Sequence, residues 1–189
     1  MMKCLILLLV ISGILSHIKI KSPKELREAF NNQPIRGSLS NFGYIPYGYT
    51  LVGRLYYDPE NTDVDMACKE IKSLWINEEH AVDENPIIMV DRGNCTFVTK
   101  VLNVQSINGE VALIVNNDDT DVNDIVMSDD GRGSSVFIPA ILINREDGKR
   151  CFLHPTPLIP LPNGEGEQFL LGPHSLRSFG PKPQEFSFF

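Results

Sequence analysis

The chain has 189 residues, of which 42% are hydrophobic, and it carries a formal net charge of −7 at pH 7. This length and apolar content are ordinary for one globular domain with a real core, and they exclude a chain that is disordered throughout. The acidic balance argues against nucleic acid or an anionic membrane surface as the main partner.

The N-terminal residues predict a secretory signal peptide at residues 1–16. Lys3 precedes an apolar run from Cys4 to Leu15, and small residues near its end are typical of a cleavage site. The run is shorter than the about 20 residues that a membrane-spanning helix needs. A buried N-terminal helix and an uncleaved anchor are the alternatives. No other segment reaches that length, so we expect a lumenal or secreted chain without a membrane span after signal cleavage.

A short helix is predicted near the start of the mature chain. Ser22 can serve as its N-cap, Pro23 occupies the first helical position, and Glu25 follows the cap by three residues. This capping box predicts a helix that runs to about Asn31. The segments after it are predicted, in chain order, as a turn-rich loop at residues 38–50, a strand at residues 51–57 and an acidic loop at residues 57–65.

The middle of the chain predicts a strand, a helix and a strand in succession. Residues 85–90, NPIIMV, are apolar almost without interruption, which is typical of a strand buried on both faces. Residues 96–108 place apolar side chains on one helical face. This order indicates a βαβ unit and an α/β fold. Further buried strands are expected at residues 110–116 and 136–143.

After Lys149 the character of the sequence changes. A helix that begins near Asn144 must stop before Pro155, because proline cannot continue a helix. Residues 151–189 are dense in proline and glycine and show no hydrophobic period, so we predict a poorly ordered tail without a final strand.

The sequence offers no catalytic motif and only a weak metal motif. HExxH, GxSxG and a Walker loop do not occur in it. Asp119, Asp121 and Asn123 alternate as in a calcium loop, but Asp124 stands where that loop needs glycine. We therefore expect the acidic loops to be solvated, with no catalytic residue, metal or cofactor.

The expected pairing state of the cysteines depends on the predicted compartment. Cys68, Cys95 and Cys151 remain after removal of the signal peptide, and in an oxidising lumen two of the three would pair. Their spacing does not indicate a zinc site.

The segment at residues 87–118 resembles the protease-associated (PA) domain. In that family a strand ends in an Arg-Gly-x-Cys-x-Phe corner, which stands here at residues 92–97, and a helix, a second strand and an Asn- or Asp-containing loop follow. An Ile-Pro-Ala strand comes later, and this chain has those residues at 138–140. All these parts occur in the order of the family.

The resemblance extends towards one branch of the family. Residues 38–57 carry an Asn-Phe-Gly loop and then proline, Tyr-Gly and Leu-Val-Gly, which is similar to the N-terminal part of plant-type vacuolar sorting receptors. Residues 67–73, ACKEIKS, are similar to the cysteine segment of that branch. The resemblance covers roughly residues 23–148.

The resemblance implies both a fold and a role. The fold is the α/β fold of the PA domain, with β-sheets or an open β-barrel-like core flanked by short helices, expected at residues 20–150. The role is a non-catalytic lumenal or secreted module that binds extended peptides or sorting signals of lumenal proteins, as in the endosomal or vacuolar pathway. The alternative is an accessory domain, a lid or regulator, separated from a protease or from a membrane-bound ubiquitin ligase.

The resemblance also implies which residues bind the ligand. Arg92 offers a planar fork of donors, Phe42 an apolar wall, and the helix from Thr96 its unpaired backbone N–H groups. Alternatively, Arg92 pairs with an aspartate and Phe42 packs in the core. The implied ligand-binding residues are Asn41, Phe42 and Gly43, Arg92, Gly93 and Asn94, and Met127 and Ser128.

Two covalent features are expected at the same corner. The resemblance implies a disulfide between Cys68 and Cys95, which leaves Cys151 unpaired. Asn94 begins the Asn-Cys-Thr triplet that is the single candidate for N-glycosylation in the chain. Because the triplet coincides with the expected disulfide and binding corner, we predict low or no glycan occupancy.

Overall fold

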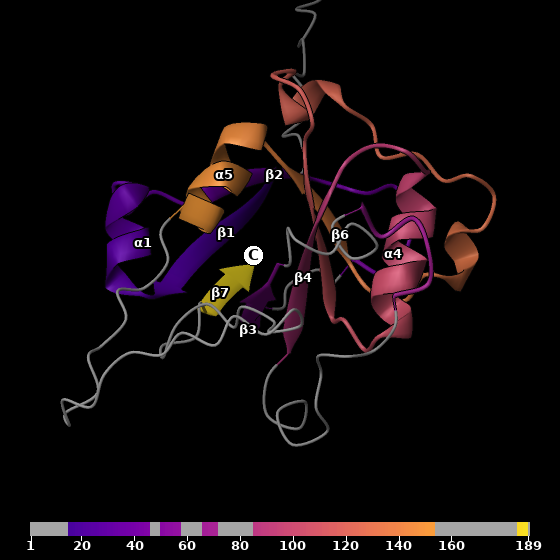
Figure 1. Ribbon diagram of the computed structural model, residues 1–189, viewed down its shortest axis with the longest axis horizontal. Helices are drawn as coiled ribbons and strands as arrows, with labels where there is room; N and C mark the ends of the chain where they lie inside the picture. The colour runs from indigo at the N-terminus through magenta and orange to yellow at the C-terminus, as the bar shows by residue number, and fades with distance from the viewer. Residues whose placement is uncertain (1–14, 46–49, 58–65, 72–84, 154–184, 189) are drawn as a thin grey trace, which may run out of the picture.

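A seven-stranded closed β-barrel forms the centre of the part of the chain that the structure describes (Figure 1). This computed structural model describes residues 15–45, 50–57, 66–71, 85–153 and 185–188. The strands are β1 (Leu15–Ser22), β2 (Ile35–Leu39), β3 (Leu51–Tyr56), β4 (Pro86–Asp91), β5 (Val111–Val115), β6 (Ala140–Ile143) and β7 (Glu185–Phe188). The helices in the described part are α1 (Lys24–Ala29), α4 (Phe97–Ser106) and α5 (Arg145–Leu153), with short 3-10 turns at Val122–Asp124 and Gly133–Ser135.

The barrel is mixed in direction. Its strand order is β1-β2-β6-β5-β4-β3-β7. The neighbours from β3 through β4 and β5 to β6 run parallel, whereas β1, β2 and β7 pair antiparallel with their neighbours. The expected α/β PA-domain fold is confirmed, with the barrel closed where an open one was expected.

Strands β4 and β5 are buried on both faces, as their continuous apolar runs predicted. Ile88 and Val90 face the cluster that includes the apolar side of α4, whereas Ile87 and Met89 face a second cluster, which contains Phe186 of β7. Figure 1 shows α4 on one side of β4, and α1 and α5 on the other side. The two cores hold β4 rigidly, and β4 delivers the corner that follows it.

The strand that closes the barrel corrects the expectation that no final strand follows α5. Residues 185–188 form β7, which pairs with β1 and with β3, and Phe186 is fully buried. Four residues carry almost no periodic signal of their own, and their pairing partners lie more than 100 residues away in the sequence. Residues 151–153 of the predicted tail belong to α5, and residues 154–184 and 189 lie outside the described residues.

The N-terminal prediction is corrected as well. Ser22 does not cap a helix but belongs to β1, where it pairs with Glu185, and α1 starts after Pro23 without a side-chain cap. Strand β2 was not expected, and it overlaps the start of the loop predicted at residues 38–50. Most of the predicted signal peptide lies outside the described residues, and β1 begins at Leu15.

Candidate functional site

The corner at Arg92 lies where three parallel strands end. Strands β4, β5 and β6 run parallel, so their carboxyl ends meet at one edge of the sheet, where ligands bind in many α/β folds. The backbone N–H of Arg92 donates to Val115 O at 2.8 Å, and that of Asn116 donates to Ile143 O at 2.9 Å. The first bond places Arg92 beside the end of β5, and the second places Asn116 beside the end of β6.

Asn116 fixes the guanidinium of Arg92. The Nη1 atom of Arg92 lies 2.8 Å from Asn116 Oδ1 and 3.6 Å from Asp118 Oδ2, and the guanidinium carbon stands 5.9 Å from the centre of the Phe97 ring. Asn116 is buried and donates to Asp118 Oδ1 at 3.0 Å and to Thr120 O at 2.9 Å. The Arg92 side chain is 29% exposed, so part of its donor fork faces solvent in a fixed position.

The alternative reading of Arg92 therefore holds in part, because the arginine does pair with an aspartate. Hydrogen bonds from Thr120, then from Asn116, and the charge of Arg92 lower the pKa of the Asp118 carboxyl. Asp118 is exposed and its ion pair with Arg92 is long, so the pair leaves the guanidinium accessible.

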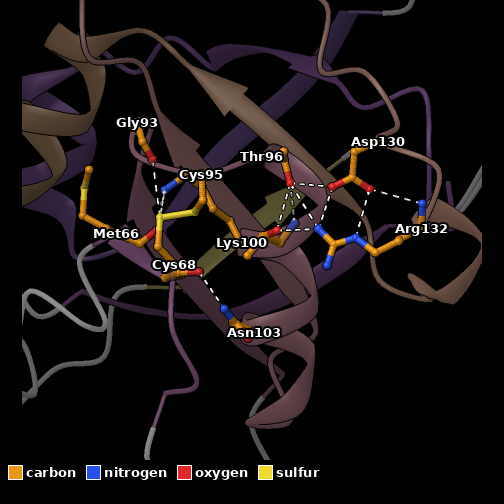
Figure 2. The surroundings of a disulfide bond; sticks show 11 residues. Met66, Cys68, Gly93, Cys95, Thr96, Lys100, Asn103, Asp130 and Arg132 are labelled. Atoms are coloured by element: carbon orange, nitrogen blue, oxygen red, sulfur yellow. Dashed lines mark hydrogen bonds and ion pairs between the residues drawn. A yellow bond between two sulfur atoms is a disulfide. The ribbon is translucent and has the colours of Figure 1, made fainter.

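A disulfide holds the loop after Arg92. Cys68 and Cys95 are joined with their Cα atoms 5.7 Å apart, as the resemblance implied (Figure 2). Cys151 is free and buried. Beside the disulfide, Lys100 of α4 donates to Met66 O and lies 3.5 Å from Cys68 Sγ. Residues 66–68 are thus attached to both the corner and α4.

The start of α4 is attached to a second loop. Thr96 is the N-cap of α4 and accepts from Thr99 N at 3.2 Å, and its hydroxyl donates to Asp130 Oδ2 at 2.6 Å. Arg132 donates to the same carboxylate oxygen at 2.6 Å and to Thr99 Oγ1 at 2.6 Å. Arg132 and Thr96 lower the pKa of Asp130 to about 2, so this link is ionic at any physiological pH.

The Asn-Phe-Gly loop lies against that second loop. Asn41 N donates to Met127 O at 3.2 Å, and Asp129 N donates to Asn41 Oδ1 at 3.0 Å. Phe42 and Met127 are only 5% and 0% exposed, so both side chains belong to the core and neither presents an apolar wall to solvent. Gly43 has φ +78 and would bring a Cβ within 2.8 Å of Val136, which accounts for the glycine structurally.

The structure thus brings the proposed ligand-binding residues into two neighbouring groups. Asn41, next to Phe42 and Gly43, is hydrogen-bonded to Met127 and Asp129 on either side of Ser128, and that loop is bonded through Asp130 to Thr96. The other group, Arg92, Gly93 and Asn94, lines a cavity of about 450 Å³.

Sequence reasoning missed most of the cavity wall. Its lining residues are Tyr57, Met66, Met89, Asp91, Arg92, Gly93, Asn94, Val115, Asn116, Asn117, Arg145, Gly148, Lys149 and Phe152. Asn116 could have been found, because it is a polar residue directly after a buried strand. The α5 residues could not, since the position of α5 is set by contacts with β5 and α1.

The geometry around Asn94 has features that favour glycosylation and features that oppose it. Asn94 is exposed, with φ +60, whereas Cys95 is in the disulfide and the Thr96 hydroxyl is bonded to Asp130. The side chain of Asn94 also lines the cavity. Low occupancy stays a prediction.

The described residues hold neither a metal-binding cluster nor a membrane-spanning helix. Among those residues, no three His, Cys, Asp or Glu side chains come together as a metal site would require. No helix among them is both long enough and apolar enough to cross a bilayer.

The fold and the corner define a PA domain. The family model described as the PA domain matches residues 51–151, and the chain belongs to that family.

Curated relatives are vacuolar-sorting receptors of plants. The chain is 26% identical over 127 residues to vacuolar-sorting receptor 3 of Arabidopsis thaliana, a match that covers 67% of this chain and 19% of that receptor. It is 26% identical over 152 residues to vacuolar-sorting receptor 2 of the same plant, with 76% and 23% covered. It is 25% identical over 140 residues to vacuolar-sorting receptor 1 of Pisum sativum, with 70% and 20% covered. The chain thus spans about a fifth of the length of these relatives.

Solved structures share the fold at low sequence identity. A zinc aminopeptidase from Bacillus subtilis matches with a TM-score of 0.52 and 14% identity, over 92% of this chain and 30% of that enzyme. At this identity the likeness concerns the fold alone.

Proposed function

We propose that this chain is a non-catalytic peptide-binding module of the secretory-pathway lumen, which takes extended segments of other lumenal proteins into the cavity at Arg92. The similarity to vacuolar-sorting receptors supports this role, and the disulfide is in keeping with an oxidising compartment. The signal peptide at residues 1–16 belongs to the same proposal.

One observation carries the proposal: a partly exposed arginine, held in place by its neighbours, lines a cavity of about 450 Å³. Asn116 and the Phe97 ring fix the guanidinium, and the disulfide fixes the loop beside it, so little conformational entropy is lost on binding. A planar fork of donors suits the carbonyl and carboxylate oxygens of a peptide.

The apolar part of the cavity suits side chains of the same ligand. Met66, Met89, Val115 and Phe152 line it together with the polar rim. Apolar walls with a few fixed polar groups are typical of ligand sites in proteins.

Selection from a library tests the proposal. Random ten-residue peptides displayed on phage are panned on the immobilised protein, and an enriched peptide is titrated by calorimetry. We expect Arg92→Ala to weaken its binding by about 1–3 kcal/mol, the range for a lost charge-assisted hydrogen bond.

The control is Arg36→Ala, because Arg36 is exposed on β2 and does not line the cavity. Circular dichroism checks that both variants keep the fold. Enrichment of no peptide above a blank surface would overturn the proposal and favour the accessory-domain alternative. Equal affinity of Arg92→Ala and wild type would remove Arg92 from the site.

A further inference from the structure

The cavity carries a charge opposite to that of the chain. Its lining includes the cations Arg92, Arg145 and Lys149 and a single acid, Asp91. The chain as a whole has a net charge of −7. A local excess of positive charge in an acidic protein favours an anionic group in the ligand.

The cations of α5 are available to such a group. Within the described residues, Arg92 contacts Asn116 and Asp118, whereas Arg145 and Lys149 enter no ion pair or side-chain hydrogen bond. Asp91, the one acid in the lining, accepts a bond of 3.4 Å from Tyr57.

The acids of α5 do not neutralise these cations. Glu146 lies 3.8 Å from Arg150, which does not line the cavity and instead packs over the ring of Phe30. The carboxyl of Asp147 is half-buried, and this burial raises its pKa. Neither acid lines the cavity.

Helix α5 presents the two cations on one face, and the buried Gly148 beside them packs against the barrel. Arg145 and Lys149 stand four residues apart, so they are neighbours on the helix surface. Gly148 lies between them, and a Cβ there would stand 2.4 Å from Val115 Cγ1. The glycine therefore lets α5 approach β5 closely enough for the cations to border the cavity.

The wall beside the cations is apolar and aromatic. Phe152, one turn after Lys149, packs edge-on against Tyr57 with ring centres 5.6 Å apart. Met66 also lines the cavity, and so do Met89 and Val115, which are only 1% and 7% exposed. A ligand that contacts both the cations and this wall carries a carboxylate next to an apolar side chain.

We propose that Arg145 and Lys149 form a specificity subsite that selects peptides with an Asp or Glu side chain beside an apolar residue. This inference rests on the proposed function and names the class of peptide that the cavity takes. The subsite lies on α5, apart from the corner residues that the resemblance points to.

The test compares the same phage library on three proteins. They are wild type, the double variant Arg145→Gln with Lys149→Gln, and a charge-matched control, Lys24→Gln with Arg36→Gln, at two exposed positions outside the cavity. We expect wild type and the control to enrich Asp and Glu beside apolar residues. The double variant should still select peptides, but without the acidic excess.

Calorimetry on one enriched peptide identifies the carboxylate. We expect its Glu→Gln form to bind wild type about fivefold to twentyfold more weakly than the parent peptide does, which corresponds to the loss of two exposed ion pairs. The double variant should bind both forms with the same affinity. Amidation of the peptide C-terminus should have a smaller effect than Glu→Gln.

Each other outcome has one meaning. If wild type enriches no peptide, the proposed function fails. If it enriches peptides without acidic residues, or if the acidic excess survives in the double variant, the subsite proposal is overturned while the proposed function stands. A loss on amidation with none on Glu→Gln also overturns it, because the carboxylate is then the peptide terminus.

Discussion

The ammonium group of Lys100 is fully buried and donates a hydrogen bond to the backbone carbonyl of Met66. This contact joins α4 to the residues that precede Cys68 (Figure 2). Asn103, one turn further along α4, donates to Ala67 O at 2.9 Å. The helix thus supports residues 66–68, which in turn anchor the loop after Arg92 through the disulfide.

Replacing Lys100 by Met should destabilise the protein. The substitution keeps the apolar stem but leaves the buried acceptor without the ammonium donor, which costs about 1–3 kcal/mol in the free energy of unfolding. Urea denaturation measures it. Lys24→Met is the control, because Lys24 is exposed and its pair with Glu28 contributes at most about 1 kcal/mol. Equal stability of Lys100→Met and wild type would show that the contact is dispensable.

Cysteine labelling should separate the disulfide from the free thiol. Burial, together with the charge of Asp147, raises the pKa of the Cys151 thiol to about 12, so at pH 8 the native protein holds almost no reactive thiolate there. We expect iodoacetamide to label none of the three cysteines after the signal region in the native state, and Cys151 alone after unfolding without reductant. Peptide mapping reads the result, and a link from Cys151 to Cys68 or Cys95 would contradict the pairing.

Substitution of Gly93 should affect both folding and binding. Gly93 has φ +130, and an added Cβ would stand 3.2 Å from Met66 Cε. We expect Gly93→Ala to lose about 1–3 kcal/mol of stability from backbone strain and to weaken binding of a selected peptide. Gly131→Ala is the matched control, since Gly131 has φ +95 with no atom within 4 Å of the added Cβ and does not line the cavity. A similar loss of peptide affinity in both variants would mean that the corner plays no special part.

Acid should release the loop at Asp130 only at very low pH. The folded pKa is depressed from 3.8 to about 2, so the link to Arg132 and Thr96 contributes fully above pH 3.8 and is lost as the pH falls through 2. The stability difference between wild type and Asp130→Asn should therefore be constant from pH 7 to pH 5 and shrink below pH 4. Urea denaturation at each pH measures it. A difference that already falls between pH 7 and pH 5 would contradict the depressed pKa.

Some elements were predictable because their signal is local. The apolar run of β4 and β5 and the 3.6-residue period of α4 lie within single segments, and both predict the observed elements to within a residue or two. Helix α5 likewise ends before Pro155, as expected. The disulfide was implied by the family resemblance and is confirmed.

The candidate site was predictable only in part. The corner with Arg92 could be read from its motif, and it does line a cavity. The core positions of Phe42 and Met127 could not be read, because an apolar residue in a loop has the same local pattern whether it faces solvent or the core. The buried Lys100 does not fit the apolar pattern expected of that helix face, and its hydrogen bond to Met66 O helps to make the burial tolerable.

The sequence by itself determined the family, the central βαβ unit and the two cysteines that pair, since each depends on residues close together or on a recognisable motif. Tertiary structure decided the rest. Strands β1, β2 and β7 form because they complete one another's hydrogen bonds around the barrel, and a four-residue strand such as β7 has no stability without those partners. Contacts with β5 and α1, which are distant in the sequence, set the position of α5, and so Arg145 and Lys149 line the same cavity as Arg92.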